Sequence, residues 1–153
     1  MPKTDNRTNG GRFEQELAGY LYGAGFWVHV LQQNKAGQPA DIIAAWRQYT
    51  TLIDCKVISN DRGFPLRRVE ENQRYAMARF SARTGYMCWF AMKLPDDDDS
   101  VYMISNMEIK RRIRDGEKTI SEEDIRKAYT LKDWIGEVQE RYDTLDEIDE
   151  WKV

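Results

Sequence analysis

The chain has 153 residues, of which 41% are hydrophobic and 32% are charged, with a formal net charge of −3. This length favours a single domain with its own core, and the apolar content excludes a disordered chain. The longest apolar run, YMCWFAM, is too short to cross a bilayer, and the polar start MPKTDNRTNGG lacks the apolar segment of an export signal. We therefore expect a folded soluble protein that does not act in a membrane.

The net charge hides an asymmetry along the chain. Residues 1–93 hold 13 Lys and Arg against 8 Asp and Glu, whereas residues 94–153 hold 10 against 18. A basic body with an acidic final segment can still bind a polyanion through its basic face. The overall negative charge therefore does not exclude nucleic acid as a partner.

The first third of the chain predicts one helix and three strands. Apolar residues recur at helical spacing from Phe13 to Ala24, and Gly25 follows as a stop signal, so residues 11–25 predict a helix. Apolar runs bounded by turn residues predict strands over residues 26–33, 40–46 and 49–58. Three strands in succession favour an antiparallel meander.

The chain then returns to a helix before two further strands. Residues 67–84 predict a helix that crosses over to a fourth strand at 86–94, followed by a fifth at 101–106. Helices are expected at 106–116, 121–129 and 131–151. The predicted fold is one α/β domain with a mixed five-stranded sheet flanked by helices. It has a flexible N-terminal arm (1–10), a core (11–106) and a helical C-terminal extension (107–153).

Two opposite charges lie near the end of the third predicted strand. Because side chains alternate between the faces of a strand, Asp54 and Lys56 point to one face and Cys55 to the other. Asp41 begins the neighbouring predicted strand. Charges at the ends of core strands are costly to bury without compensation, and Mg²⁺ bound by carboxylates and water would supply it. A simple ion pair at the end of the sheet is the alternative.

This pattern resembles the motif of the PD-(D/E)xK nuclease superfamily. Asp41 is similar to the first acid, and Asp54-Cys55-Lys56 is similar to the (D/E)xK element. Pro39 stands one residue further from the aspartate than in the literal motif. The resemblance implies a restriction-endonuclease-like fold and catalytic roles for the two aspartates and the lysine.

Further segments resemble the Holliday-junction resolvases of this superfamily, of the Hjc and RecU types. Gly10 and Glu14 have the spacing of their glycine and metal-binding glutamate on the first helix. The segment Phe64-Pro65-Leu66 with Gln73, and more faintly EKTISEEDIRKA, is similar to the RecU type. The resemblance covers residues 9–94 well and the rest weakly.

The resemblance implies that DNA phosphodiester bonds are hydrolysed with Mg²⁺, for which Mn²⁺ would substitute, leaving 5′-phosphate and 3′-hydroxyl ends. Asp41 and Asp54 would bind the ion, together with Glu14 and the backbone carbonyl of Cys55. Lys56 would act either as a base or as a stabiliser of developing charge, and both roles are open.

Two side chains are selected by the resemblance and not by the residues themselves. Glu14 and Glu16 flank the apolar stripe of the first helix on opposite edges, so helical geometry does not choose between them. Gln73 lies on the apolar stripe of its helix, where a buried glutamine needs partners. It would make either a helix-to-sheet hydrogen bond or, as the resemblance implies, a contact to the metal site or its water.

Arginines concentrate around the predicted site and are suited to phosphate through their planar fork. The candidates for DNA contact are Arg7, Arg12, Arg62, Arg67, Arg68, Arg74, Arg79 and Arg83. Branched DNA, recognised by shape, is the implied partner. Because two strands must be cut symmetrically, the resemblance also implies a homodimer. The apolar stripe formed by Leu131, Trp134, Val138, Tyr142 and Leu145 is a candidate interface, although packing onto the protein's own core is the favoured fate.

The leading hypothesis is a Mg²⁺-dependent endonuclease that resolves four-way DNA junctions, in the cytoplasm of a bacterial, archaeal or virus-infected cell. The alternatives are a restriction- or repair-type nuclease of the same superfamily and a non-catalytic DNA-binding module. Two other features are not assigned a role in the chemistry. His29 is expected to be structural or exposed, and the run Asp96–Asp99 is expected to be a solvated turn.

Overall fold

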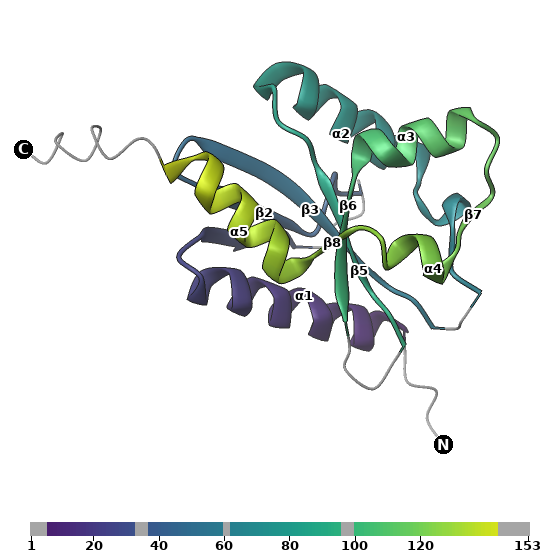
Figure 1. The fold of residues 1–153 in the computed structure, drawn as a ribbon, viewed down its shortest axis with the longest axis horizontal. Helices are drawn as coiled ribbons and strands as arrows, with labels where there is room; N and C mark the ends of the chain where they lie inside the picture. Colours follow the sequence, from purple (N-terminus) through teal and green to yellow (C-terminus); the bar gives the residue numbers. More distant parts are fainter. Residues whose placement is uncertain (1–5, 33–36, 60–61, 96–99, 144–153) are drawn as a thin grey trace, which may run out of the picture.

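A mixed six-stranded sheet with helices on both faces forms the frame of the protein (Figure 1). The computed structural model describes residues 6–32, 37–59, 62–95 and 100–143, with side chains from residue 11 onward. Within these ranges, no helix has the length and apolar character needed to cross a bilayer. In chain order the elements are α1 (Asn6–Gly23), β1 (Trp27–Val30), β2 (Ile42–Trp46), β3 (Tyr49–Val57), β4 (Phe64–Pro65), the 3₁₀ turn η1 (Leu66–Arg68), α2 (Glu71–Thr84), β5 (Trp89–Lys93), β6 (Val101–Ser105), α3 (Asn106–Arg114), β7 (Thr119–Ile120), α4 (Glu122–Ile125), β8 (Tyr129–Thr130) and α5 (Leu131–Arg141).

The topology of the sheet follows the predicted order with one addition. β1, β2 and β3 form the antiparallel meander, and α2 crosses over so that β5 pairs parallel with β3. β6 then returns antiparallel to β5. The α/β class, the meander and the crossover are thus confirmed. The prediction of five strands is wrong, because β8 pairs with the outer side of β6 through Tyr102 and Thr130. A two-residue strand carries no periodic pattern from which it could be predicted.

Each face of the sheet carries its own apolar core. On one face, Leu17 of α1 and Trp134 of α5 are buried against the strands. On the other, Met77 of α2 and Ile109 of α3 pack over Phe90 of β5. Figure 1 shows α1 and α5 on one side of the sheet and α2 and α3 on the opposite side. The catalytic candidates must therefore lie at an edge or an end of this layered core.

The apolar stripe of the last helix packs onto the protein's own core. Trp134 and Val138 are buried, and Leu131 and Tyr142 are partly buried in the same cluster. Leu145, the last member of the stripe, lies outside the described residues, as do the run Asp96–Asp99 and residues 144–153 of the predicted final helix. The described part of this stripe is therefore not available as an interface.

The boundaries of several helices differ from the prediction. The helix predicted at 121–129 is only the short α4, and Tyr129 belongs to β8. α1 begins at Asn6, within the segment expected to be a flexible arm, and runs through the paired glycines Gly10 and Gly11. α2 begins at Glu71 and not at residue 67, because η1 is followed by Val69 and Glu70 in extended conformation. Gly85, at a φ of 79°, ends α2 with a left-handed cap.

β4 and β7 form a separate two-stranded ribbon just beyond the end of β3. Phe64 pairs with Ile120, and both side chains are fully buried. Gly63, at a φ of +90°, lies so close to β7 that a Cβ would collide with the carbonyl oxygen of Ile120. Leu66 continues the pairing, since its N–H donates to the carbonyl of Lys118 at 2.9 Å. Only glycine fits at the start of this ribbon.

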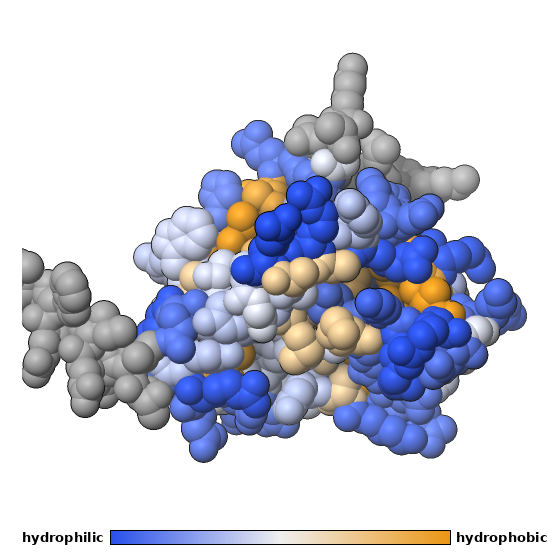
Figure 2. Space-filling model, turned by 90° about the horizontal axis from the view of Figure 1, so that it is seen from above, coloured by the Kyte–Doolittle hydropathy of each residue, from blue (hydrophilic) through white to orange (hydrophobic). Residues whose placement is uncertain are grey.

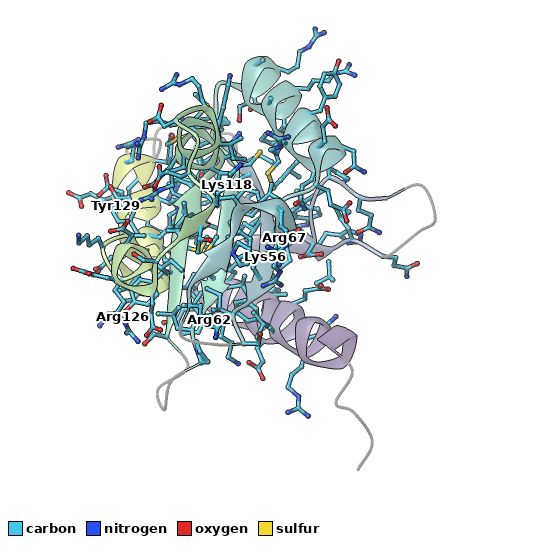
Figure 3. The ribbon with its side chains drawn as sticks, turned by 90° about the vertical axis from the view of Figure 1, so that its right-hand side faces the viewer. Lys56, Arg62, Arg67, Lys118, Arg126 and Tyr129 are labelled. Atoms are coloured by element: carbon cyan, nitrogen blue, oxygen red, sulfur yellow. The ribbon has the colours of Figure 1, made fainter. Side chains whose placement is uncertain are left out.

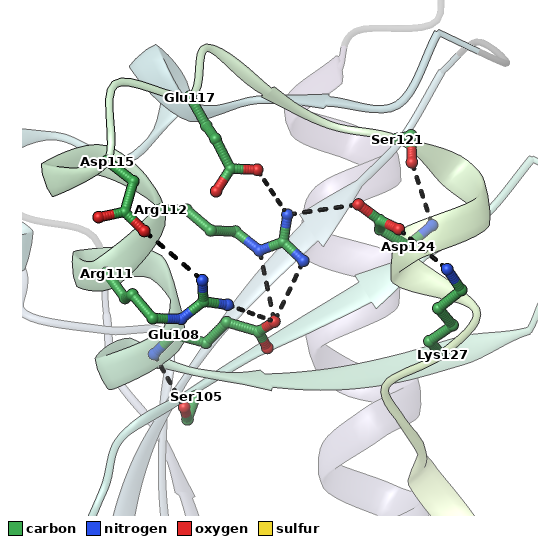
Figure 4. Close-up of polar contacts among 9 residues, drawn as sticks. All are labelled: Ser105, Glu108, Arg111, Arg112, Asp115, Glu117, Ser121, Asp124 and Lys127. Carbon is green, nitrogen blue, oxygen red and sulfur yellow. Dashed lines mark hydrogen bonds and ion pairs between the residues drawn. The ribbon is translucent and has the colours of Figure 1, made fainter.

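One arginine ties the segment around β7 to the third helix. Arg112 of α3 lies 3.2 Å from Glu108 of the same helix, 2.9 Å from Glu117 just before β7 and 3.5 Å from Asp124 of α4 (Figure 4). Its side chain is only 11% exposed. A guanidinium with three carboxylate partners is a strong and directional anchor, so β7 and α4 are held firmly against α3.

A cleft of about 560 Å³ separates α2 from α3 on the opposite side of the sheet from α1. Met77, Phe90 and Ile109 lie at its floor, and Tyr75 and Met107 stand exposed at its rim. Figure 2, seen from the side of α2 and α3, shows hydrophobic residues at the surface between hydrophilic ones. This face therefore presents apolar surface that the described chain does not cover.

Candidate active site

The polar residues singled out by the sequence meet where β2 begins and β3 ends. Asp41 directly precedes β2, Asp54 and Lys56 belong to β3, and Gln73 lies on α2. Asp41, Asp54 and Gln73 are 8%, 4% and 8% exposed, and they are three of the four buried polar side chains in the described residues. Burying acidic groups is costly unless they have hydrogen-bond or ion-pair partners, so the partners of each group show how its burial is compensated.

Asp41 lies against the backbone of β3. Its Oδ2 accepts a hydrogen bond from the N–H of Cys55 at 2.7 Å, and its own N–H donates to the carbonyl of Ile53 at 3.1 Å. The second contact continues the β2–β3 pairing, in which Ile42 is opposite Ile53. Pairing of the two strands therefore fixes the Asp41 carboxylate beside the backbone that follows Asp54.

Asp54 is held by a side chain from each of two elements. Its Oδ1 accepts a hydrogen bond from Nε2 of Gln73 at 2.7 Å, and its Oδ2 lies 2.9 Å from Nζ of Lys56. The predicted placement of Asp54 and Lys56 on one face of the strand agrees with this ion pair. The lysine ammonium also donates to the backbone carbonyl of Arg68 in η1 at 3.3 Å. A backbone carbonyl has no signature in the sequence, so this last contact could not be predicted.

Because three carboxyl groups lie close together, it is unfavourable for all of them to be ionised. Burial and then the charge of Asp41 raise the pKa of Asp54 to about 7, although Lys56 opposes the shift. Burial raises the pKa of Asp41 too, against the bond from Cys55, and Glu14 adds to the rise. Burial likewise raises the pKa of Glu14, with Asp54 contributing and Asp41 opposing. Mutual repulsion of this kind is what a bound cation relieves.

The geometry separates the two glutamates that helical periodicity could not. Glu14 is half-buried on the side of Asp41 and Asp54, where burial and the charge of Asp54 raise its pKa and its contact with Asp41 lowers it. Glu16 is exposed on the other side of α1, where its Oε2 lies 3.5 Å from Nζ of Lys93. Glu14 therefore joins the acidic cluster and Glu16 does not.

Two buried oxygens that lack a hydrogen bond mark where a hard cation or its water would fit. In the described residues, Oδ2 of Asp54 and Oε1 of Gln73 are buried without a hydrogen-bond partner, since the Lys56 contact is an ion pair outside hydrogen-bond geometry. Buried oxygens that lack a hydrogen bond match the all-oxygen preference of Mg²⁺. As the side chains stand, no three His, Cys, Asp or Glu groups of the described chain converge tightly enough to hold a metal ion. The oxygen donors fit the ion, and binding it would require the carboxylates to converge further.

Most of the predicted DNA-contacting arginines have exposed side chains. Arg12, Arg62, Arg67, Arg68, Arg74, Arg79 and Arg83 are exposed, whereas the side chain of Arg7 lies outside the described residues. Figure 3 shows Arg62 and Arg67 on the same side of the molecule as Lys56. Arg68 is partly engaged, since one guanidinium nitrogen donates to the carbonyl of Val57 at 3.1 Å and the group lies over the ring of Phe64.

Replacing Gln73 by leucine should raise the pKa of Asp54 further. The amide of Gln73 stabilises the ionised carboxylate, and a hydrogen bond to a charged group is worth about 1.5 kcal/mol, or about one pKa unit. A ¹³C NMR titration of the Asp54 carboxyl in metal-free protein would measure the shift. Gln15, exposed on α1, provides the control substitution Gln15→Leu. An unchanged Asp54 titration in Gln73→Leu would mean that the amide does not support the carboxylate.

Comparison with known proteins agrees with this fold. The family model described as archaeal Holliday junction resolvase (Hjc) matches residues 5–142. Among solved structures, Hjc from Archaeoglobus fulgidus, described as a Holliday junction resolvase from an archaeal hyperthermophile, is 22% identical with a TM-score of 0.60. The match covers 84% of this chain and 96% of that one, and it establishes the shared fold. No curated protein sequence matches the chain.

Proposed function

Because the chain belongs to the archaeal Holliday junction resolvase (Hjc) family, we propose that it resolves four-way DNA junctions by metal-dependent hydrolysis of phosphodiester bonds. The observation that carries the proposal is the buried Asp54, which is bonded to Gln73 and paired with Lys56 beside the Asp41 carboxylate. A fold does not by itself specify a reaction, but this constellation supplies groups suited to one.

The metal would be held by oxygen ligands from three elements. Asp41, Asp54 and Glu14 would provide carboxylates, and Mg²⁺, or Mn²⁺ in its place, would polarise the phosphate and acidify a bound water. The backbone carbonyl of Cys55 would add a neutral ligand. The N–H of Cys55 already points to Asp41, and in an extended strand the N–H and C=O of one residue point to the same side.

Lys56 would stabilise the negative charge that develops on the phosphate during attack. Its ammonium is paired with Asp54 at 2.9 Å and bonded to the Arg68 carbonyl, two contacts that both favour a charged, fixed donor. These contacts favour the electrostatic role over that of a base. Gln73 would hold the Asp54 carboxylate in place and offer its free oxygen to a metal-bound water.

The DNA backbone would cross the basic side of the molecule that carries Lys56. Arg12, Arg62, Arg67 and Arg74 would contact phosphates around the cut, and Arg68 would do so with its remaining donors. We propose a homodimer, because two symmetric cuts need two sites related by a twofold axis. Exposed Tyr75 and Met107 at the cleft between α2 and α3 support that face as the dimer contact.

Cleavage of a labelled immobile four-way junction and of the matching linear duplex would test the proposal. With Mg²⁺ or Mn²⁺ we expect paired symmetric nicks near the crossover, and none with EDTA. Glu14→Gln should lower the rate by about a hundredfold or more, since it removes a metal ligand. Glu16→Gln is the matched control on the same helix and should cut at the wild-type rate.

The assay also separates the competing functions. Equal cutting of junction and duplex would favour a repair- or restriction-type nuclease of the same superfamily. Binding of the junction without any cutting would favour a non-catalytic DNA-binding module. Equal loss in Glu14→Gln and Glu16→Gln would remove Glu14 from the metal site and leave the rest of the proposal standing.

A further inference from the structure

The β4–β7 ribbon brings a distant lysine close to the catalytic lysine. β4 pairs with β7 so that Pro65 is opposite Thr119, and the carbonyl of Lys118 accepts the N–H of Leu66 at 2.9 Å. Leu66 begins η1, the turn in which the carbonyl of Arg68 accepts Nζ of Lys56 at 3.3 Å. Lys118 therefore flanks the turn that holds Lys56, although it belongs to the acidic part of the sequence.

The cations of this region face solvent together. Lys118 and Arg67 are both exposed, and Figure 3 shows them with Lys56 on the side of the molecule turned toward the viewer. Neither Lys118 nor Arg67 makes an ion pair with another residue of the described chain, so their charges are not neutralised by these residues. Arg126 also lies on this side, but it is engaged with Glu122 at 2.8 Å.

Two of the acidic residues near Lys118 are bound to a buried arginine. Glu117, the preceding residue, points its carboxylate onto Arg112 at 2.9 Å, and Asp124 reaches the same guanidinium at 3.5 Å (Figure 4). Arg112 is only 11% exposed, so these negative charges are partly neutralised at a nearly buried site. A phosphate approaching Lys118 therefore meets less repulsion than the acidic sequence of this region predicts.

The ribbon is also fixed before any partner arrives. Gly63 packs directly on the Ile120 carbonyl, the Phe64 and Ile120 side chains are fully buried, and Arg112 anchors the approach to β7. Arg68 donates to the carbonyl of Val57 at the end of β3, and its guanidinium lies over the ring of Phe64. Binding to a fixed surface loses little conformational entropy, which favours affinity.

From these contacts we infer that the β4–β7 ribbon is a second DNA-contacting element, in which Lys118 binds a backbone phosphate next to the one contacted by Arg67. The inference rests on the proposed junction-cleaving function and extends its binding surface to Lys118, which the sequence did not indicate as a DNA contact. Because the contact is to phosphate, it positions the DNA arm on the active site and carries no base specificity.

Binding of a fluorescent four-way junction, with Ca²⁺ in place of Mg²⁺ to prevent cutting, would test the inference across a series of salt concentrations. Lys118→Ala should weaken binding about three- to tenfold and reduce the slope of log K against log salt by about 0.9, the value for one lost phosphate contact. Lys132→Ala, an exposed lysine of α5 on the other face of the sheet, is the matched control and should change neither quantity.

The outcomes are distinguishable from a failure of the proposed function. Wild-type affinity and an unchanged salt slope in Lys118→Ala would overturn the ribbon contact and leave junction cleavage intact. An equal loss in Lys118→Ala and Lys132→Ala would overturn it too, because the effect would then reflect net charge alone. Wild-type protein that neither binds nor cuts junctions would overturn the proposed function and, with it, this inference.

Discussion

Asp54→Asn is expected to abolish junction cleavage while making the metal-free protein more stable at pH 8. Cleavage should fall by about a thousandfold or more, because the substitution removes a charged metal ligand and the partner of Lys56. Stability should rise because the wild-type carboxylate is buried, only 4% exposed, beside a second carboxylate. Active sites commonly hold groups that disfavour the folded state.

The pKa shift of Asp54 determines whether the substitution raises or lowers the free energy of unfolding at a given pH. The pKa of Asp54 is about 7 in the folded protein against 3.8 for the ordinary group, so the folded state binds more protons between these values. The stability contributed by protonated Asp54 is fully present below pH 3.8 and is lost as the pH rises through about 7. Asparagine resembles the protonated form at every pH. The advantage of Asp54→Asn should therefore be on the order of 4 kcal/mol at pH 8 and less than half of that at pH 5.

Urea unfolding in EDTA at the two pH values would measure the difference. Asp133→Asn, at an exposed position of α5, is the control and should change the free energy of unfolding by less than about 0.5 kcal/mol. A variant less stable than wild type at pH 8 would show that Asp54 and Lys56 form a stabilising ion pair. In that case the two charges would belong to the architecture of the sheet end and not to a metal site.

Sequence periodicity was sufficient to predict the strands and helices that bury a continuous apolar face. The alternation in β3 placed Asp54 and Lys56 on one face, and the helical stripe of α2 placed Gln73 toward the sheet, where it bonds Asp54. The short strands β4, β7 and β8 were missed because two residues have no period, and they exist only through their tertiary partners. For the same reason the position of Lys118 near η1 could not be predicted, because it depends on pairing between β4 and β7.

Which residues belong to the candidate site was harder to predict than the kind of site, a cation site. Carboxylates and a lysine at strand ends indicated a cation site from the residues alone, but Glu14 and Glu16 were indistinguishable by helical position. The structure separates them through their neighbours, Asp41 for Glu14 and Lys93 for Glu16. The bond from Lys56 to the Arg68 carbonyl depends on η1, a turn that periodicity had assigned to the following helix.

Gly63→Ala is expected to destabilise the protein far more than Gly85→Ala. Both glycines have positive φ, +90° and +79°, so either substitution adds the strain of a left-handed conformation, about 1 kcal/mol. They differ in their surroundings. A Cβ at Gly85 meets nothing within 4 Å among the described residues, whereas one at Gly63 collides with the backbone of Ile120. Backbone cannot move aside as a flexible side chain does, so Gly63→Ala should cost on the order of 3 kcal/mol or more.

Urea unfolding of the two variants at one pH would separate crowding from strain, because Gly85→Ala measures strain alone. Folded Gly63→Ala should also bind four-way junctions more weakly than Gly85→Ala, since displacing β7 moves Lys118 away from Arg67 and η1. Equal destabilisation by the two substitutions would mean that β7 yields easily to the added methyl group. The ribbon would then be a deformable segment, and the fixed position of Lys118 could not account for DNA binding. A large difference in stability, accompanied by a loss of affinity, would instead link the close packing at Gly63 to the surface that holds the junction.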